Sequence, residues 1–177
     1  MTFMNDAPRI RRSMLFMPGA NARAMAKARE LPCDGVILDL EDAVAVDAKA
    51  EARSQVAATV RAGGFGYREL VVRVNALETP WGTEDLAALS GLPVDGLLFP
   101  KVETTHQVDQ IVTATEAAGL GSVPLWFMIE TPKGVLDVRA IAERTRRLAV
   151  LVMGTSDLVK DMRAAHIPDR ANLSFAL

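Results

Sequence analysis

The stretch P-L-W-F-M-I-E-T-P, residues 124–132, contains the arrangement on which the fold prediction depends. Its apolar run over 124–129 has the length of a strand that is buried on both faces. Glu130 follows directly, and the second proline disfavours the helical conformation at the threonine before it, so a strand is expected to end here. The segment 135–147 then has one apolar and one charged face, which predicts a helix. The unit is a buried strand, a polar turn and a helix.

The same unit occurs five more times along the chain. Further apolar runs lie at 13–18, 35–40, 70–75, 96–100 and 148–153, and helical segments at 22–30, 48–62, 83–89, 105–118 and 157–165. Asn21 is expected to cap the first of these helices. Strands that alternate with helices form parallel sheets through right-handed crossovers. We therefore predict an α/β fold with six strand–helix units in a single domain over 13–177, preceded by a flexible segment at 1–12.

Composition excludes several classes of protein. The 177 residues are 50% hydrophobic and 24% charged, with a formal net charge of −2, as is typical of a globular chain. This balance argues against a nucleic-acid-binding face or a polybasic membrane surface, and no stretch suits a transmembrane helix. The N-terminus lacks the apolar core of a signal peptide, and a single cysteine excludes an internal disulfide. These features predict a cytoplasmic protein that binds neither nucleic acid nor membrane.

Two parallel architectures remain, a doubly wound sheet and a barrel. The turn after the first strand, M-P-G-A-N at 17–21, lacks the glycine pattern of a dinucleotide-binding fold. Polar side chains instead follow nearly every strand, namely Asp39, Glu41, Asp42, Arg73, Asn75, Lys101, Glu103, Glu130, Ser156 and Asp157. Polar groups at the carboxyl ends of successive strands are typical of a barrel, whereas a doubly wound sheet gathers them at one switch point. We therefore predict a TIM (β/α)8-type barrel.

The chain supplies about six of the eight units of such a barrel. A complete barrel takes roughly 250 residues, and six strands leave two open sheet edges that favour pairing with another chain. We therefore expect a partial barrel that is C-terminally truncated, or a homo-oligomer that supplies the rest.

Two carboxylates at the expected carboxyl end of the sheet are candidate metal ligands. Glu130 and Asp157 follow adjacent strands, separated by one helix and one strand. Two carboxylates, together with water and a chelating substrate, suit Mg²⁺. Taken singly, Asp157 could cap a helix and Glu130 could be a solvated loop residue. Their occurrence at one end of the sheet favours the metal site.

Arg73 lies within the otherwise apolar run V-V-R-V-N. A buried arginine needs a partner, so Arg73 either holds a ligand carboxylate with two hydrogen bonds or forms a salt bridge with Glu41 or Asp42. The acids of L-D-L-E-D could bind metal, hold Arg73 or cap the next helix, and Lys101 could pair with Glu41 or face a ligand. No serine–histidine or cysteine–histidine arrangement stands out, which argues against nucleophilic hydrolysis.

Six segments resemble the citrate lyase β-subunit-like branch of the HpcH/HpaI aldolases, which includes malyl-CoA and citramalyl-CoA lyases. They are R-S-M-L-F-M-P-G (12–19), V-I-L-D-L-E-D-A-V (36–44), V-R-V-N-A-L-E-T-P-W-G (72–82), L-F-P-K-V-E (98–103), M-I-E-T-P-K-G-V-L (128–136) and G-T-S-D-L-V-K-D (154–161). They follow the family's order and spacing and cover about residues 9–177. The resemblance implies a TIM barrel that cleaves or forms a carbon–carbon bond next to a CoA thioester.

The resemblance also implies roles for individual residues. Glu130 and Asp157 match the Mg²⁺ ligands, and Arg73 matches an arginine that holds the 2-oxo acid or polarises the thioester carbonyl. The acids of L-D-L-E-D match a supporting group. The candidate catalytic residues are therefore Arg73, Glu41 and Asp42, the candidate substrate-binding residues Arg73, Arg12, Ser13 and Lys101, and the candidate metal ligands Glu130 and Asp157, with Asp39 in support. Arg12 and Ser13 resemble part of a CoA-facing edge.

The implied activity is Mg²⁺-dependent cleavage of a 3-hydroxyacyl-CoA, such as malyl-CoA or citramalyl-CoA, into acetyl-CoA and a 2-oxo acid. The family also implies a trimer or hexamer, and a C-terminal extension, absent here, whose aspartate serves a neighbouring subunit. Three alternatives remain: a truncated, non-catalytic paralogue that binds metal and oxo acid or only a partner subunit, a citrate lyase β subunit acting on an acyl-carrier-protein thioester, and an aldolase acting on free hydroxy-oxo acids. The sequence does not distinguish malyl from citramalyl substrates, because one methyl group changes binding by only ~1–3 kcal/mol.

Overall fold

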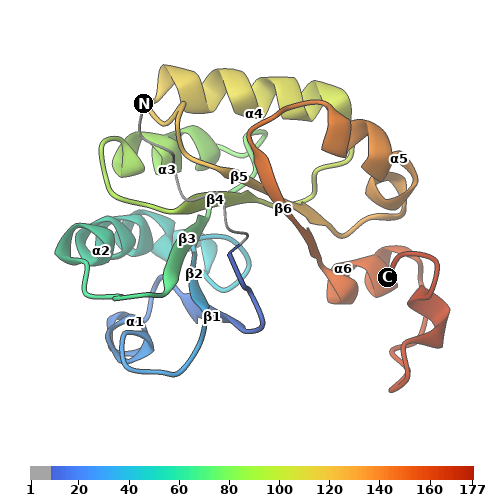
Figure 1. Cartoon of the computed structure of the whole chain (residues 1–177), viewed down its shortest axis with the longest axis horizontal. Helices are drawn as coiled ribbons and strands as arrows, with labels where there is room; N and C mark the ends of the chain where they lie inside the picture. Colours follow the sequence, from blue (N-terminus) through green and yellow to red (C-terminus); the bar gives the residue numbers. More distant parts are fainter. Residues whose placement is uncertain (1–8) are drawn as a thin grey trace.

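Six strands form one parallel sheet in the computed structural model, which describes residues 9–177 (Figure 1). They are β1 (Met14–Pro18), β2 (Gly35–Asp39), β3 (Glu69–Arg73), β4 (Gly96–Phe99), β5 (Leu125–Ile129) and β6 (Leu148–Met153). Their order across the sheet is their order along the chain, and every neighbouring pair is parallel. A doubly wound sheet reverses its strand order at a switch point. The absence of a reversal in these six strands confirms the barrel-type topology predicted from the sequence.

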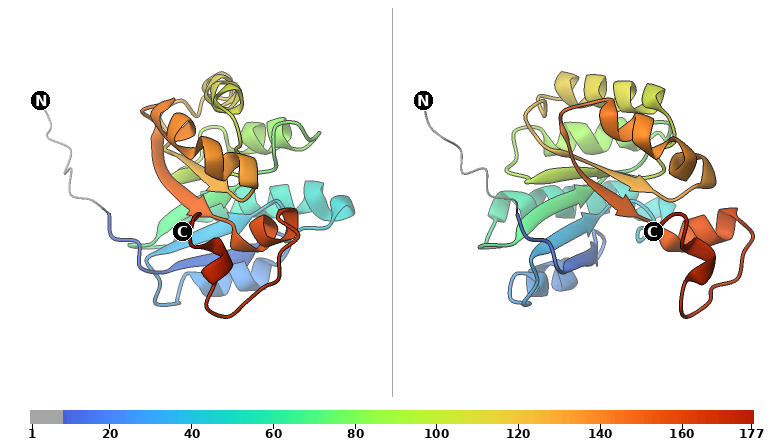
Figure 2. Two further views of the ribbon diagram at one scale, coloured as in Figure 1. Left: turned by 90° about the vertical axis from the view of Figure 1, so that its right-hand side faces the viewer. Right: turned by 45° about the vertical axis from the view of Figure 1, so that its right-hand side comes forward.

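Each crossover between strands contains a helix. The helices are α1 (Ala22–Ala28), α2 (Lys49–Ala62), α3 (Gly82–Leu89), α4 (Thr105–Ala117), α5 (Pro132–Glu143) and α6 (Thr155–Asp161), with short 3-10 turns η1 (Val46–Ala48) and η2 (Ala171–Leu173). Helices α1 to α5 surround the outer side of the curved sheet, whereas α6 and η2 extend beyond the end of β6 (Figure 2). Among the described helices, none combines the length and the hydropathy that crossing a bilayer requires.

Local sequence explains where these helices begin. The Asn21 side chain accepts a hydrogen bond from the Ala24 amide at 2.9 Å, so the predicted cap of α1 is confirmed. Helix α5 begins at Pro132, three residues before the predicted start, because proline is compatible with the first helical position. The Thr131 hydroxyl then accepts from the Gly134 amide and caps that helix.

Alternate residues of each strand belong to two different layers of packing. One face of the sheet packs against the helices through Val36, Leu38, Val72, Leu97, Phe99, Leu125, Phe127 and Ile129. The opposite face carries Ile37, Val71, Leu98, Trp126 and Met128, and we call it the inner face. Because side chains alternate along a strand, the inner face also carries the residues two positions after Ile37, Val71 and Met128, namely Asp39, Arg73 and Glu130.

Residues 9–12 are attached to the amino end of the inner face. Arg11 donates from Nε and Nη2 to the buried Glu69 carboxylate at 2.6 and 2.8 Å, and its guanidinium lies 5.1 Å from the centre of the Trp126 ring. These residues fall within the segment predicted to be flexible, yet ion pairs hold them to the sheet. The rest of that predicted segment, 1–8, lies outside the described residues.

Burial differs between central and edge strands. Strands β2 to β5 are buried at every position, as predicted. Strands β1 and β6 each have one neighbour within residues 9–177, and Phe16 and Leu151 are 40% and 41% exposed. The prediction of burial on both faces was therefore wrong for these two strands, because each lacks a second neighbour in this sheet.

Candidate functional site

The carboxyl ends of the strands bring the predicted acidic residues to one end of the inner face. Asp39 ends β2, Arg73 ends β3, Glu130 follows β5, and Asp157 lies in the first turn of α6. We call this end of the sheet the carboxyl rim. An open cleft of about 270 Å³ lies here, and Asp42, Arg73, Glu130 and Asp157 are among the residues that line it.

Three carboxylates surround the buried guanidinium of Arg73. Its Nε and Nη2 donate to the Asp39 carboxylate at 2.7 and 2.5 Å, and Nη1 lies 2.9 Å from Glu41 Oε2 and 3.7 Å from Asp42 Oδ2. The salt bridge considered in the sequence analysis is therefore present, with Asp39 as an additional partner. Arg73 was considered as a group that holds a ligand carboxylate with two hydrogen bonds, but its Nε and Nη2 already donate to Asp39.

Asp39 also shapes the loop that follows β2. Besides binding Arg73, its carboxylate accepts hydrogen bonds from the amides of Glu41 and Ala43 at 2.9 and 3.3 Å. The loop therefore wraps around one buried carboxylate, which directs Glu41 and Asp42 back towards Arg73. A supporting role in catalysis, which the resemblance implied for Asp39, stays a prediction.

Lys49 supports the same loop from beneath and was missed in the sequence analysis. Its ammonium is buried and donates to the Leu40 and Glu41 carbonyls and to Asn75 Oδ1, each at 2.7 Å. Burial lowers the pKa of Lys49, although Glu41 and other nearby acids oppose the shift. The available signal was its spacing, because Lys49 lies three residues before Ala52 on the buried face of α2.

Glu130 is the most strongly perturbed acid of the cleft. Its side chain is buried, which raises its pKa to about 7, and the negative charge of Asp157 adds to this effect. The Lys101 amide donates to Glu130 Oε1 at 2.9 Å and opposes the shift. The other oxygen lies against Gly154, where a Cβ atom would be 2.5 Å from Oε2. A residue without a side chain at 154 therefore makes room for the Glu130 carboxylate.

Asp157, which is half-buried, and the exposed Lys101 form a pair beside Glu130. Lys101 Nζ lies 3.5 Å from Asp157 Oδ2, so Lys101 pairs with Asp157 and not with Glu41, the partner considered from the sequence. Asp157 does not cap α6 either, since the residue at the cap position is Gly154. Its carboxylate is 24% exposed and remains available to a ligand in the cleft.

The donor set of the cleft fits a hard divalent cation. Within residues 9–177, no group of three or more histidine, cysteine or acidic side chains forms a ready-made metal cage. Glu130 and Asp157 nevertheless supply two oxygen donors and leave room for water and a chelating ligand, which is how Mg²⁺ is commonly bound. Five acids share this region with three cations, Arg73, Lys101 and Lys49, so formal negative charge is in excess.

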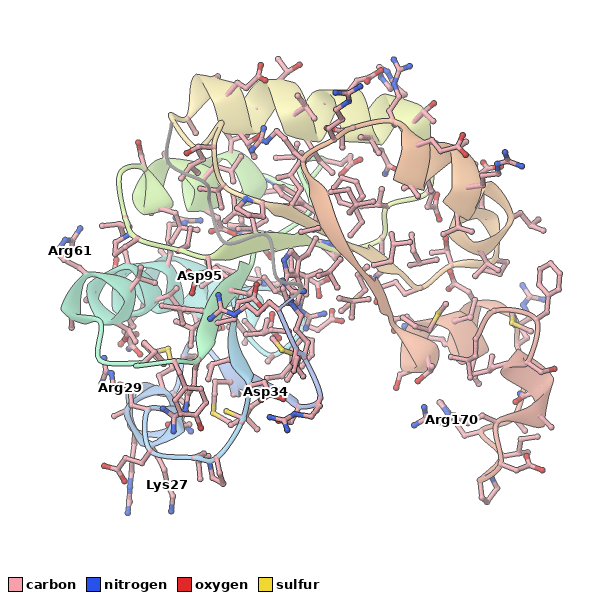
Figure 3. All side chains as sticks on the ribbon, viewed as in Figure 1. Lys27, Arg29, Asp34, Arg61, Asp95 and Arg170 are labelled. Atoms are coloured by element: carbon pink, nitrogen blue, oxygen red, sulfur yellow. The ribbon has the colours of Figure 1, made fainter. Side chains whose placement is uncertain are left out.

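Arg12 and Ser13 lie at the other end of the sheet. They precede β1, and residues that precede a parallel strand lie at its amino end. Asp34, which precedes β2, accepts from Arg12 Nη2 at 2.8 Å and from the Ser13 amide at 3.2 Å (Figure 3). A five-residue strand spans roughly 17 Å. The structure therefore places these two residues away from Glu130 and Asp157, and their assignment to a CoA-facing edge stays a prediction.

Comparisons with known proteins agree with this arrangement. A family model described as HpcH/HpaI aldolase/citrate lyase matches residues 12–177. A (3S)-malyl-CoA thioesterase of Cereibacter sphaeroides is 41% identical over 166 residues, which cover 94% of this chain and 56% of that protein. The citrate lyase subunit beta of Escherichia coli is 36% identical over 174 residues, covering 95% and 58%. The chain thus spans a little over half the length of these relatives.

A solved structure carries the same fold. The citrate lyase beta subunit of Mycobacterium tuberculosis, complexed with oxaloacetate and magnesium, aligns with a TM-score of 0.71 and 28% identity. The alignment covers 88% of this chain and 64% of that one.

Proposed function

Because the chain belongs to the HpcH/HpaI aldolase/citrate lyase family, we propose that it forms the metal- and oxo-acid-binding part of a carbon–carbon lyase. The substrate is a 3-hydroxyacyl-CoA such as malyl-CoA or citramalyl-CoA, and the products are acetyl-CoA and a 2-oxo acid. The name of the malyl-CoA relative supports a CoA thioester, and the oxaloacetate complex supports an oxo acid.

The observation that carries the proposal is the pair Glu130 and Asp157 in one cleft. Glu130 is held by the Lys101 amide and by the close approach of Gly154, so one of its oxygens is fixed before any ligand arrives. Asp157 lines the same cleft from α6. Glu130 and Asp157 are the residues that would hold Mg²⁺, and the ion would act as a Lewis acid towards the substrate.

Arg73 supplies positive charge for the thioester half of the reaction. Cleavage converts the substrate hydroxyl to a carbonyl, breaks the carbon–carbon bond and moves the electron pair onto the thioester enolate, which is then protonated on carbon. Arg73 can stabilise the charge on the thioester oxygen. Asp39 holds the guanidinium in place beforehand, so little ordering is left to occur on binding.

Glu41 and Asp42 are the proposed catalytic acids beside Arg73. Burial raises the pKa of Glu41, with Arg73 opposing and Asp42 adding to the shift. A carboxyl group whose pKa moves towards neutrality can both accept and return a proton. Asp42 is more exposed and lines the cleft.

Two relatives favour alternative reactions at the same site. The thioesterase name of the 41% identical protein favours hydrolysis of a malyl-CoA thioester. The 36% identical citrate lyase subunit favours an acyl-carrier-protein thioester as substrate. Hydrolysis of malyl-CoA releases malate and free CoA thiol, whereas lyase cleavage releases glyoxylate and acetyl-CoA, so the products discriminate directly.

Calorimetric binding of oxalate, an oxo-acid enolate mimic, tests the site itself. We expect binding to require Mg²⁺ and to be lost in Glu130→Gln and Asp157→Asn. Oxalate binding that is unchanged in both variants would refute the assignment of the metal ligands. Incubation with malyl-CoA, with glyoxylate and free thiol measured in parallel, then separates lyase, thioesterase and binding-only behaviour.

A further inference from the structure

Lys101 contacts both candidate metal ligands, one through its backbone and one through its side chain. Its amide donates to Glu130 Oε1 at 2.9 Å, and its ammonium lies 3.5 Å from Asp157 Oδ2. Lys101 follows β4, which lies between β3 and β5 in the sheet. A single residue therefore joins the two acids, which come from different parts of the chain.

The backbone at this position is unusual for lysine. Lys101 has a φ of 51°, in the left-handed region that glycine adopts far more easily. The amide that holds Glu130 would be equally available from a glycine. A lysine at position 101 therefore offers its side chain as the one feature that glycine, the residue favoured by this backbone conformation, would lack.

The ammonium is charged but loosely held. Burial opposes its charge, but Asp157, followed by Glu41, Asp42 and Glu130, outweighs burial and raises the pKa of Lys101. The side chain is 49% exposed. Exposed ion pairs contribute little stability, so the ammonium can leave Asp157 at small cost when a stronger cation arrives.

A bound oxo acid also needs a partner for its carboxylate. The sequence suggested Arg73, but Asp39 engages Nε and Nη2 of that side chain. Of Arg73 and Lys101, Lys101 has the exposed side chain, whereas Arg73 is buried. An ammonium and a divalent cation repel each other at Asp157, so binding of the cation frees Lys101 for another anion.

We propose that Lys101 is a counter-ion that changes partner: it holds Asp157 when no cation is bound, and pairs with the carboxylate of the oxo acid once a divalent cation occupies Asp157. This inference rests on the proposed function, because it assumes the metal ligands Glu130 and Asp157. It makes Lys101 a positioning residue for Asp157 in one state and a substrate-binding residue in the other.

Removal of the ammonium should change two affinities in opposite directions. Without Lys101 to compete, Mn²⁺, used as a spectroscopic substitute for Mg²⁺, should bind about tenfold more tightly, a change of ~1.4 kcal/mol. Oxalate should bind the Mn²⁺-loaded protein about tenfold more weakly. A merely structural defect would weaken both, so the opposite signs identify the exchange of partners.

The experiment compares Lys101→Met and Lys101→Gly with wild type. Free Mn²⁺ is followed by electron paramagnetic resonance, and oxalate binding by calorimetry at saturating Mn²⁺. Lys101→Gly keeps the amide and suits the backbone, so it remains usable if Lys101→Met fails to fold. Lys27→Met is the matched control, because Lys27 is an exposed lysine in the last turn of α1 (Figure 3). We expect Lys27→Met to leave both affinities unchanged, and Lys101→Arg to restore oxalate binding.

The outcomes separate this inference from the proposed function. If wild type binds Mn²⁺, Glu130→Gln abolishes binding and the Lys101 variants match wild type, the metal site stands and the role of Lys101 is refuted. If neither wild type nor the Lys101 variants bind Mn²⁺, both proposals fail. Mn²⁺ binding that occurs only after the ammonium is removed would support the competition at Asp157 and refute a Mg²⁺ site in the wild-type chain.

Discussion

Asp39 and Arg73 are paired both in the backbone and in the side chains. Their Cα atoms are partners in the ladder between β2 and β3, and the Asp39 carboxylate accepts from Nε and Nη2 of Arg73. Both side chains are buried. The parallel register therefore places a charge pair at the base of the cleft, where it orders the acids around it.

Loss of the Asp39 charge should destabilise the fold. Asp39→Asn leaves the buried Arg73 guanidinium with weaker partners, and we expect the free energy of unfolding to fall by about 3 kcal/mol. Urea denaturation measures the change. Asp109→Asn is the matched control, since Asp109 binds Arg144 with the same two-bond geometry on the surface. We expect this substitution to change the free energy of unfolding by less than about 1 kcal/mol. Equal effects of the two substitutions would show that burial adds nothing to the Asp39 pair.

Cation affinity should depend on pH through Glu130. The pKa of Glu130 in the cation-free site is raised to about 7, and a cation binds the ionised carboxylate. Affinity should therefore be constant at high pH and fall by up to about tenfold per pH unit below pH 7. Calorimetry in buffers of different ionisation enthalpy should detect close to one released proton at pH 6. No proton release at that pH would contradict direct ligation by Glu130.

A methyl group at position 154 should damage the site more than the fold. In Gly154→Ala the new Cβ would meet Glu130 Oε2 at 2.5 Å, so the carboxylate must move. We expect Mn²⁺ affinity to fall at least about tenfold, with a stability loss of about 1–3 kcal/mol. Gly121→Ala is the control, because its nearest contact would be an ordinary 3.5 Å to Glu116. Unchanged Mn²⁺ affinity in Gly154→Ala would mean that Glu130 does not need its present position.

Lys49 should be required for order in the loop after β2. Lys49→Met removes one donor from the Leu40 and Glu41 carbonyls, which keep the Asn75 side-chain amide and the Val44 amide, and leaves the buried Asn75 Oδ1 without its ammonium partner. We expect a loss of roughly 1–3 kcal/mol of stability. Hydrogen exchange should accelerate at the Glu41 and Ala43 amides and remain slow within β3. Lys133→Met, at an exposed position in α5, controls for loss of charge. Uniform acceleration across the sheet would indicate general destabilisation and contradict a local role.

The strands were predictable because their signal is local. The run before Glu130 is apolar at each position, and a central strand of a parallel sheet buries each position. Parallel topology then implied that Glu130 and Asp157 share one end of the sheet. The start of α5 was less predictable, because Pro132 both ends a strand signal and can begin a helix.

The partners within the site were not predictable in the same way. The engagement of Arg73 by Asp39 depends on the register between β2 and β3, which neither segment specifies alone. Lys49 resembles a surface lysine until α2 packs against the sheet. Arg12 and Ser13 were assigned to a CoA-facing edge by resemblance of a segment, and that assignment stays a prediction.

The agreement between strand order and chain order has a consequence for how the protein folds. Each strand pairs only with strands that are adjacent to it along the chain, so no pairing among these six has to wait for a distant segment. Short loop closures are kinetically favoured over long ones. The sheet can therefore grow one strand–helix unit at a time from the buried central strands, and the exposed edge strands β1 and β6 should be the last to gain protection during refolding.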